Sequence, residues 1–282
     1  MGRAGTDPDP PSFVPAYSVA KTATAAAVLR AGLPLDAPIG RLTEAPGPLA
    51  ALTVGDLLAH RSGLGDYAGW PEYRAAVAAR EDAWPAAEVL ARAAREPLAT
   101  PGAFRYSNVG YLLVRRALEE HDGAPLHDVL TARVLAPLGI DARPFVTRAD
   151  WAGVAASLPV EPQLAAYDPG WVYPGTFVTD GRGLATLVRG VAAGHLGHDV
   201  MRRMSEGRAV DAPGHPLDEP GYGLGLMTSG RPARVVGHGG GGPGFTLVVL
   251  ATTDGTRAHS RVEAGEVDDR PLYRACLDAL QA

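Results

Sequence analysis

A serine and a lysine lie three residues apart near the start of the chain, in the sequence Ser18-Val19-Ala20-Lys21. At the start of a helix such residues share one face, so the hydroxyl and the amine can meet. A serine hydroxyl is a weak nucleophile until a neighbouring group accepts its proton. A lysine buried beside apolar side chains has a lowered pKa and can share that work. The pair indicates covalent catalysis at Ser18, and the alternative is a capping serine followed by a surface lysine.

The lysine is informative because it is alone. Of the 26 lysines and arginines in the chain, only Lys21 is a lysine. A GC-rich genome explains the excess of arginine, alanine, glycine and proline. Against that background, a lysine at position 21 predicts a role that arginine cannot fill, because lysine can lose its proton when it is desolvated and arginine cannot.

Tyr106-Ser107-Asn108 follows a turn and precedes a predicted helix. A phenol at Tyr106 could act as a general base if nearby cations hold it ionised, although an unperturbed tyrosine titrates near ~10. Taken alone, the segment is better explained by a packed aromatic ring at Tyr106 and a helix cap at Asn108.

A run of glycines around His238 lies between two predicted strands, at residues 237–242. Its spacing matches the dinucleotide-binding fingerprint, but a strand follows it where that fingerprint needs a helix, so we reject this interpretation. Glycines beside a strand edge indicate close approach of the backbone to a ligand. His238 could contact a carboxylate or move a proton.

The composition excludes several classes of protein. The chain has 282 residues, a net charge of −5 and one cysteine, Cys276, so we expect no nucleic-acid partner, no disulfide framework and no multi-cysteine metal site. No apolar run approaches the ~18 residues of a membrane span. His195 and His198 offer only two metal ligands, so no metal site is expected. Residues 60–64 are interpreted as a helix end and turn.

The elements that must position these residues differ along the chain. An alanine-rich, buried helix is predicted at 17–31, followed by a region of short helices with candidates at 53–60, 85–95, 108–120, 125–135 and 180–194. Thr53 and Asp180 are the candidate N-caps of the first and last of these. Strands are predicted at 234–237, 245–252 and 257–263, and a helix at 270–280 on the same face of the sheet as the helix at 17–31, or beside it. The fold class is α+β, an antiparallel sheet flanked by helices. Residues 1–39 and 206–282 form the predicted sheet subdomain, and 40–205 a mostly helical one.

The three motifs occur in a set order: Ser-x-x-Lys at 18–21, Tyr-x-Asn at 106–108 and the glycine-flanked motif at 238–240. This order resembles the serine β-lactamase and penicillin-binding-protein superfamily, and within it the branch of class C β-lactamases, D-alanyl-D-alanine carboxypeptidases and family VIII esterases. The resemblance covers about residues 13–282. It is supported by the stretches LTVGDLLAHRSGL (52–64), FRYSNVGYLLV (104–114), LAPLGI (135–140), YPGTFVTDGRGLATL (173–187) and GYGLGLM (221–227).

The resemblance implies that Ser18 is the acylated nucleophile. It also implies that Lys21 and Tyr106 share the proton of Ser18, with Tyr106 as the base and its pKa lowered by Lys21; which group takes the proton is disputed across the superfamily. Asn108 would hold the acyl side of the substrate.

The same resemblance places His238, Gly239 and Gly240 at the strand motif that usually reads Lys-Thr-Gly. The backbone N–H groups of Ser18 and Gly241 would form the oxyanion hole. A largely neutral imidazole at position 238 anchors a carboxylate poorly, which favours esters or thioesters over penicillins and D-Ala-D-Ala peptides.

Only 17 residues precede Ser18, fewer than the helix and two strands that the resemblance implies. These residues contain no apolar segment typical of a signal peptide, and we expect a flexible lead-in at 1–12 and a cytoplasmic protein. Without the N-terminal strands, one sheet edge would be bare, which predicts a homodimer or a natural protein longer at its N-terminus.

Together these features predict a serine hydrolase or acyltransferase that forms a covalent acyl-enzyme on a small-molecule ester, thioester or amide, without a cofactor, in a biosynthetic role. Two alternatives stay open. One is D-alanyl-D-alanine carboxypeptidase or β-lactamase activity. The other is a catalytically degenerate binding or scaffold protein.

Overall fold

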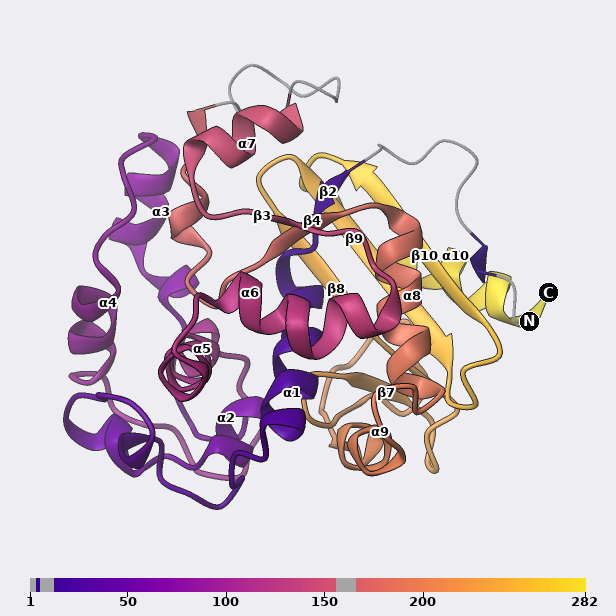
Figure 1. Ribbon diagram of the computed structural model, residues 1–282, viewed down its shortest axis with the longest axis horizontal. Coiled ribbons are helices and arrows are strands. Elements are labelled where there is room, and N and C mark those ends of the chain that lie inside the picture. The colour runs from indigo at the N-terminus through magenta and orange to yellow at the C-terminus, as the bar shows by residue number, and fades with distance from the viewer. Residues whose placement is uncertain (1–3, 6–12, 156–165) are drawn as a thin grey trace.

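The computed structural model describes residues 4–5, 13–155 and 166–282. Helices of the first two thirds of the chain gather on one side, and the strands of the last third form a sheet on the other (Figure 1). Helix α1 (Ala20–Ala31) lies between the two. None of the helices in these residues is long and apolar enough to cross a membrane.

The main sheet has seven strands in the order β1-β10-β9-β8-β7-β6-β5, and every neighbouring pair is antiparallel except β1 with β10. The strands are β1 (Ala4–Gly5), β5 (Arg208–Ala209), β6 (Gly221–Tyr222), β7 (Met227–Ser229), β8 (Val235–Gly242), β9 (Phe245–Thr252) and β10 (Ala258–Ala264). The predicted strand at 245–252 is confirmed. The predicted strand at 234–237 extends further, because residues 238–242, which were placed between two strands, continue β8 and pair with β9 along its length. This agrees with the strand motif that the resemblance places at 238–240.

The sequence predicted an unpaired strand at one edge of the sheet. This is wrong for two residues of the edge strand β10. Residues of β1 pair in parallel with Ala258 and His259 of β10, so the lead-in itself covers part of the edge. The rest of the predicted flexible lead-in, residues 1–3 and 6–12, lies outside the described residues. The homodimer stays a prediction, but this pairing removes part of the reason for it.

A second, three-stranded sheet holds the chain just before Ser18. Its strands are β2 (Val14–Pro15), β4 (Phe177–Thr179) and β3 (Arg143–Pro144), with β4 in the middle. The amide of Ala16 donates to the carbonyl of Phe177 at 2.8 Å. The short 3-10 turn η1 (Tyr17–Val19) therefore starts from a fixed point and leads directly into α1.

The remaining helices include three that were not predicted, at 71–78, 148–155 and 198–205, and the others lie close to their predicted positions. They are α2 (Val54–Leu58), α3 (Pro71–Ala78), α4 (Ala86–Ala93), α5 (Asn108–Asp122), α6 (Leu126–Leu130), the π-helical turn η5 (Thr131–Leu135), α7 (Arg148–Ala155), α8 (Gly181–Ala192), α9 (His198–Ser205) and α10 (Arg270–Gln281). Short 3-10 turns lie at Ile39–Arg41, Gly47–Ala51, Tyr67–Gly69, Ala136–Leu138 and Pro169–Trp171. Thr53 and Asp180 cap α2 and α8 as expected.

Strand β9 is buried on both faces, which explains its unbroken run of apolar residues. Leu247 and Val249 face the core that contains α1 and α8, whereas Val248 and Leu250 pack against α10. The expectation that the C-terminal helix lies on the same face as α1 is therefore wrong: α10 covers the opposite face. Successive side chains of a strand point to opposite faces of the sheet, so β9 packs against α1 and α8 on one face and against α10 on the other.

The glycines of β8 set how closely that strand approaches η1, and their substitution tests this. A Cβ on Gly242 would lie 2.6 Å from the Tyr17 ring, whereas a Cβ on Gly241 meets nothing within 4 Å. Because the Tyr17 hydroxyl is held by the carbonyl of Pro243, the ring cannot easily move away. We expect Gly242→Ala to lower the free energy of unfolding by about 1–3 kcal/mol, measured by urea denaturation. Gly241→Ala is the matched control, and equal losses in the two variants would contradict this account.

Candidate active site

The backbone at the residue before the nucleophile adopts an unusual conformation. Tyr17 has φ of 43°, in the left-handed region that a tyrosine seldom occupies. Its ring packs against Gly242, and its hydroxyl donates to the carbonyl of Pro243. The turn between β8 and β9 therefore fixes Tyr17, and with it the direction in which Ser18 leaves the chain.

Three side chains from two distant segments meet at one oxygen. Lys21 Nζ lies 3.1 Å from Ser18 Oγ, and the Tyr106 hydroxyl donates a hydrogen bond of 2.7 Å to the same oxygen. Lys21 Nζ also lies 5.0 Å from the centroid of the Tyr106 ring. The structure brings together the three residues expected to be catalytic. The arrangement can accept a proton from the serine and return it to a leaving group.

Lys21 is only 3% exposed, within a helix whose neighbouring residues are all buried. Burial lowers its pKa from 10.5 to about 7, and the charge of Asp66 opposes part of that shift. A desolvated ammonium loses the hydration that stabilises its charge, which makes the neutral amine accessible near neutral pH. Lys21 can therefore serve as a proton acceptor for Ser18.

The pKa of Tyr106 is shifted upward, whereas the resemblance implies a downward shift. Burial raises its pKa, and the nearby Asp66 raises it further, while the hydrogen bond to Ser18 lowers it only in part. The expected lowering of the Tyr106 pKa by Lys21 is not found, and desolvation is the largest cause of the shift. The side chain is a phenol in the resting site, suited to donating a proton rather than accepting one.

His60 positions Tyr106, a role that the sequence analysis missed. Its Nδ1 accepts the backbone N–H of Ser107 at 3.1 Å, and its ring centroid lies 4.2 Å from that of Tyr106. The side chain is fully buried, and burial, with the charge of Lys21, lowers its pKa so that the ring is neutral. His60 has φ of 55°, and this left-handed backbone after α2 turns its side chain under the tyrosine. The segment is a helix end and turn as expected, but it also supports the site.

Asn108 does not cap helix α5. The cap is Ser107, whose hydroxyl accepts the amide of Gly110 at 3.2 Å. This leaves the Asn108 side chain at the cleft, where its Nδ2 donates to Asp66 Oδ2 at 2.9 Å.

Strand β8 lies directly against the nucleophile turn. A Cβ on Gly240 would lie 3.0 Å from the carbonyl oxygen of Ala16 and 3.3 Å from the amide nitrogen of Ser18, so a side chain here would press the nucleophile turn away from β8 by a few tenths of an ångström. Gly239 faces the other layer, where a Cβ would lie 2.6 Å from the Tyr273 hydroxyl. Both glycines nevertheless line the cleft through their backbone, as does Gly241.

His238 lies beneath the cleft. Its Nε2 is 2.9 Å from the Tyr222 hydroxyl, its Nδ1 is 2.5 Å from the carbonyl oxygen of Gly239, and its side chain is 1% exposed. Burial and the nearby charge of Lys21 lower the pKa of His238 to about 3. The imidazole is neutral, as the sequence analysis expected, and both ring nitrogens are occupied within the protein.

Ser18 lies between two hollows. One, of about 160 Å³, has an aromatic wall that includes Tyr67, Tyr73 and Trp171, and it also contains Lys21 and Asn108. The other, of about 530 Å³, runs along β8 toward Met227 and Tyr273, with Glu266 and Asp269 at its rim. A substrate whose carbonyl lies at Ser18 would thus have separate spaces for its acyl part and its leaving group.

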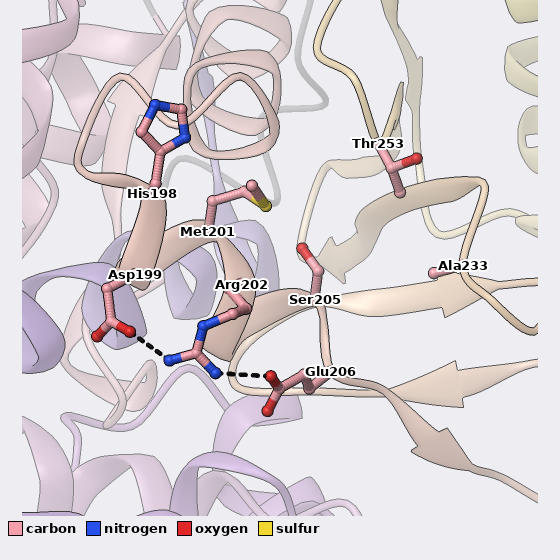
Figure 2. Close-up of a pocket in the computed structure, with 8 residues that line it drawn as sticks. All are labelled: His198, Asp199, Met201, Arg202, Ser205, Glu206, Ala233 and Thr253. Atoms are coloured by element: carbon pink, nitrogen blue, oxygen red, sulfur yellow. Dashed lines mark hydrogen bonds and ion pairs between the residues drawn. The ribbon is translucent and has the colours of Figure 1, made fainter.

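A larger groove of about 600 Å³ lies elsewhere, between α9 and the loops that carry Ala233 and Thr253 (Figure 2). Arg202 bridges Asp199 and Glu206 along its wall, so its charges are paired internally. None of the predicted site residues lines it. Among the described residues, no cluster of three histidine, cysteine or acidic side chains could hold a metal ion.

Comparison with known proteins places the chain in a family. A family model described as Beta-lactamase matches residues 3–258. The chain belongs to the beta-lactamase family. Its structural neighbours share the β-lactamase/transpeptidase fold and include penicillin-binding-protein-like and D-amino acid amidase enzymes. A search of curated proteins found no match.

Three solved structures show how far this beta-lactamase family member resembles others. A D-stereospecific amidohydrolase from Streptomyces sp. is 26% identical, with a TM-score of 0.76 over 94% of this chain and 86% of the other. A D-amino acid amidase from Ochrobactrum anthropi SV3 is 22% identical, with a TM-score of 0.74 over 96% and 83%. An octameric penicillin-binding protein homologue from Pyrococcus abyssi is 20% identical, with a TM-score of 0.73 over 96% and 66%.

The role of His60 can be tested with two substitutions. His60→Leu removes the acceptor of the Ser107 amide, whereas His60→Asn keeps an acceptor and tolerates the left-handed backbone. Because small displacements of a catalytic group are costly, we expect His60→Leu to slow the reaction of Ser18 with a fluorophosphonate probe by about 10- to 100-fold. His60→Asn should recover most of that rate. Equal loss of rate in both variants, in proportion to their loss of thermal stability, would show that His60 is only part of the core.

Proposed function

We propose that this protein is a serine acyl hydrolase or acyltransferase that forms a covalent acyl-enzyme at Ser18 on small-molecule amides, esters or thioesters. The observation that supports this is the placement of Ser18 Oγ within hydrogen-bond distance of both Lys21 Nζ and the Tyr106 hydroxyl, between two hollows. Intact side chains at all three positions disfavour the alternative of a catalytically degenerate scaffold.

In the acylation step, the neutral amine of Lys21 takes the proton of Ser18 as Oγ attacks the substrate carbonyl carbon. The carbonyl oxygen becomes an oxyanion, which the backbone N–H groups of Ser18 and Gly241 would stabilise. When the intermediate collapses, the bond to the leaving group breaks and the leaving atom takes a proton from the Tyr106 phenol. The Lys21 ammonium then reprotonates Tyr106, and the acyl group remains on Ser18.

In the deacylation step, water or another nucleophile attacks the acyl-enzyme, and the same groups move its proton in the reverse direction. Water yields hydrolysis, and an amine or alcohol yields acyl transfer. The rim of the larger hollow is open, so an acceptor can enter from the side that the leaving group has left.

Two observations bear on the substrate. His238 is neutral and bound inside the protein, so it supplies no cation for the carboxylate of a penicillin or a D-Ala-D-Ala peptide. Two similar structures are an amidohydrolase and an amino acid amidase. We therefore include amides of amino acids among the proposed substrates, beside the esters and thioesters that His238 favours, and place β-lactamase and carboxypeptidase activity second.

The nucleophile can be identified by incubation with a fluorophosphonate probe followed by intact-mass measurement. The wild-type protein should gain the mass of one probe adduct, and Ser18→Ala should gain none, since that change removes the attacking oxygen. Lys21→Arg keeps the positive charge but supplies no neutral amine, so its labelling should be at least ~10²-fold slower.

Ser205→Ala is the matched control, because Ser205 lies in the groove of Figure 2, apart from the proposed site. It should label at the wild-type rate. Labelling that persists in Ser18→Ala, or wild-type labelling in Lys21→Arg, would overturn the proposal.

A further inference from the structure

We propose that Glu266 is a specificity-determining residue whose carboxylate binds a cation carried by the leaving group or the acyl acceptor, so that this protein takes alcohols, thiols or amines bearing an ammonium group on that side of the cleft. This inference rests on the proposed function, because it concerns the larger hollow beside Ser18. Glu266 has no role in the sequence analysis, in the family resemblance or in the proton transfers proposed above.

The two hollows of the site differ in charge. In the acyl hollow, the charged lining residue is Lys21. In the larger hollow the described lining contains no lysine or arginine, and its charged residues are Glu266, Asp268 and Asp269. His238 also lines that hollow, but its imidazole is neutral. A wall that carries only negative charge attracts a cation and repels a carboxylate.

Of the three carboxylates in this hollow, Glu266 is the one best placed to act on a substrate. Asp268 is already occupied, because its Oδ1 accepts the amide of Arg270 at 3.2 Å and lies 3.9 Å from the guanidinium Nε of that residue. Asp269 is the residue at which α10 starts. Within residues 13–155 and 166–282, Glu266 forms no ion pair. A substrate cation would therefore not have to displace an arginine from it.

The backbone on both sides of Glu266 is anchored to the β8–β9 hairpin. The amide of Gly265 donates to the carbonyl of Gly244 at 2.8 Å. The hydroxyl of Thr246 donates to the carbonyl of Gly265 at 2.9 Å and accepts the amide of Val267 at 3.0 Å. Thr246 is buried, so these bonds are shielded from water. Glu266 is thus held at the end of the hairpin that also contacts the nucleophile turn.

Glu266 and Ser18 line the same hollow, so one substrate can reach both. Burial raises the pKa of Tyr17, and the charge of Glu266 raises it further, which shows that the carboxylate acts on the residue before the nucleophile. Met227 and the exposed Val267 line this hollow as well. The substrate part that fits is therefore a short apolar chain that ends in an ammonium group. Because Glu266 is exposed, we expect a preference of a few-fold.

The test compares thioesters of 3-phenylpropionic acid that differ only in the charge of the leaving thiol. One series carries a trimethylammonium group on a chain of two, three or four methylene groups, and the other carries a tert-butyl group of the same shape. For the wild type at low ionic strength, we expect kcat/KM to be at least about threefold higher for the cationic thioester at one or more chain lengths. Added sodium chloride should reduce this ratio, since ions screen an exposed charge.

In Glu266→Gln the ratio should fall to about one, because the amide keeps the shape of the side chain without its charge. Glu263→Gln is the matched control, since it removes the same charge from β10 at a position that lines neither hollow. It should keep the wild-type ratio. A wild-type ratio of one or less at every chain length, a ratio unchanged in Glu266→Gln, or equal losses in the two variants would overturn the assignment.

A binding measurement separates this assignment from the proposed function. Ser18→Ala lacks the attacking oxygen, so the thioesters stay intact on it and their dissociation constants can be measured by calorimetry. The cationic thioester should bind at least about threefold more tightly than its neutral partner, and Ser18→Ala/Glu266→Gln should bind both equally. Equal binding to Ser18→Ala would overturn the role of Glu266. If this preference is found but the wild type cleaves neither thioester faster than Ser18→Ala does, the proposed function fails and the assignment of Glu266 is retained.

Discussion

The site depends on the removal of one ammonium group from water. Lys21 carries the only amine side chain in the protein, and its position in α1 leaves it only 3% exposed, so its ammonium form loses most of its hydration. Desolvation makes the amine a base, but only because Ser18 lies one helical turn away and presents its hydroxyl at 3.1 Å. The apolar helix therefore does more than fill the core, since it sets the protonation state on which the proposed chemistry depends.

The rest of the fold brings distant segments to that buried amine. The glycines of β8 let that strand lie close against the nucleophile turn. The helical region supplies Tyr106, which lies just before the start of α5. His60 supports that tyrosine from behind, and Tyr17 connects the turn to the far end of β8. Each of these contacts joins residues far apart in sequence, so the site forms only when the sheet and the helical region pack against α1.

The sequence predicted the features that local pattern or chemistry determines. The strand at 245–252, the caps at Thr53 and Asp180 and the convergence of Ser18 with Lys21 could be predicted because hydrophobic runs, capping residues and helical spacing act over a few residues. Tertiary packing decided what was missed. Glycines that resemble a loop become a strand when β9 pairs with them, and His60 acquires its role only from a ring that lies 46 residues later. The raised pKa of Tyr106 likewise follows from burial, which no motif reports.

The protonation state of Lys21 is the most direct test of this account, and the composition makes it measurable. Because the chain has one lysine, labelling with lysine enriched in ¹⁵N at Nζ and ¹³C at Cε yields a single side-chain signal. Its chemical shift, followed by NMR from pH 5 to pH 10, should titrate with a pKa of about 7. A signal that titrates near the ordinary lysine value of about 10.4 would contradict the claim that burial makes Lys21 the base.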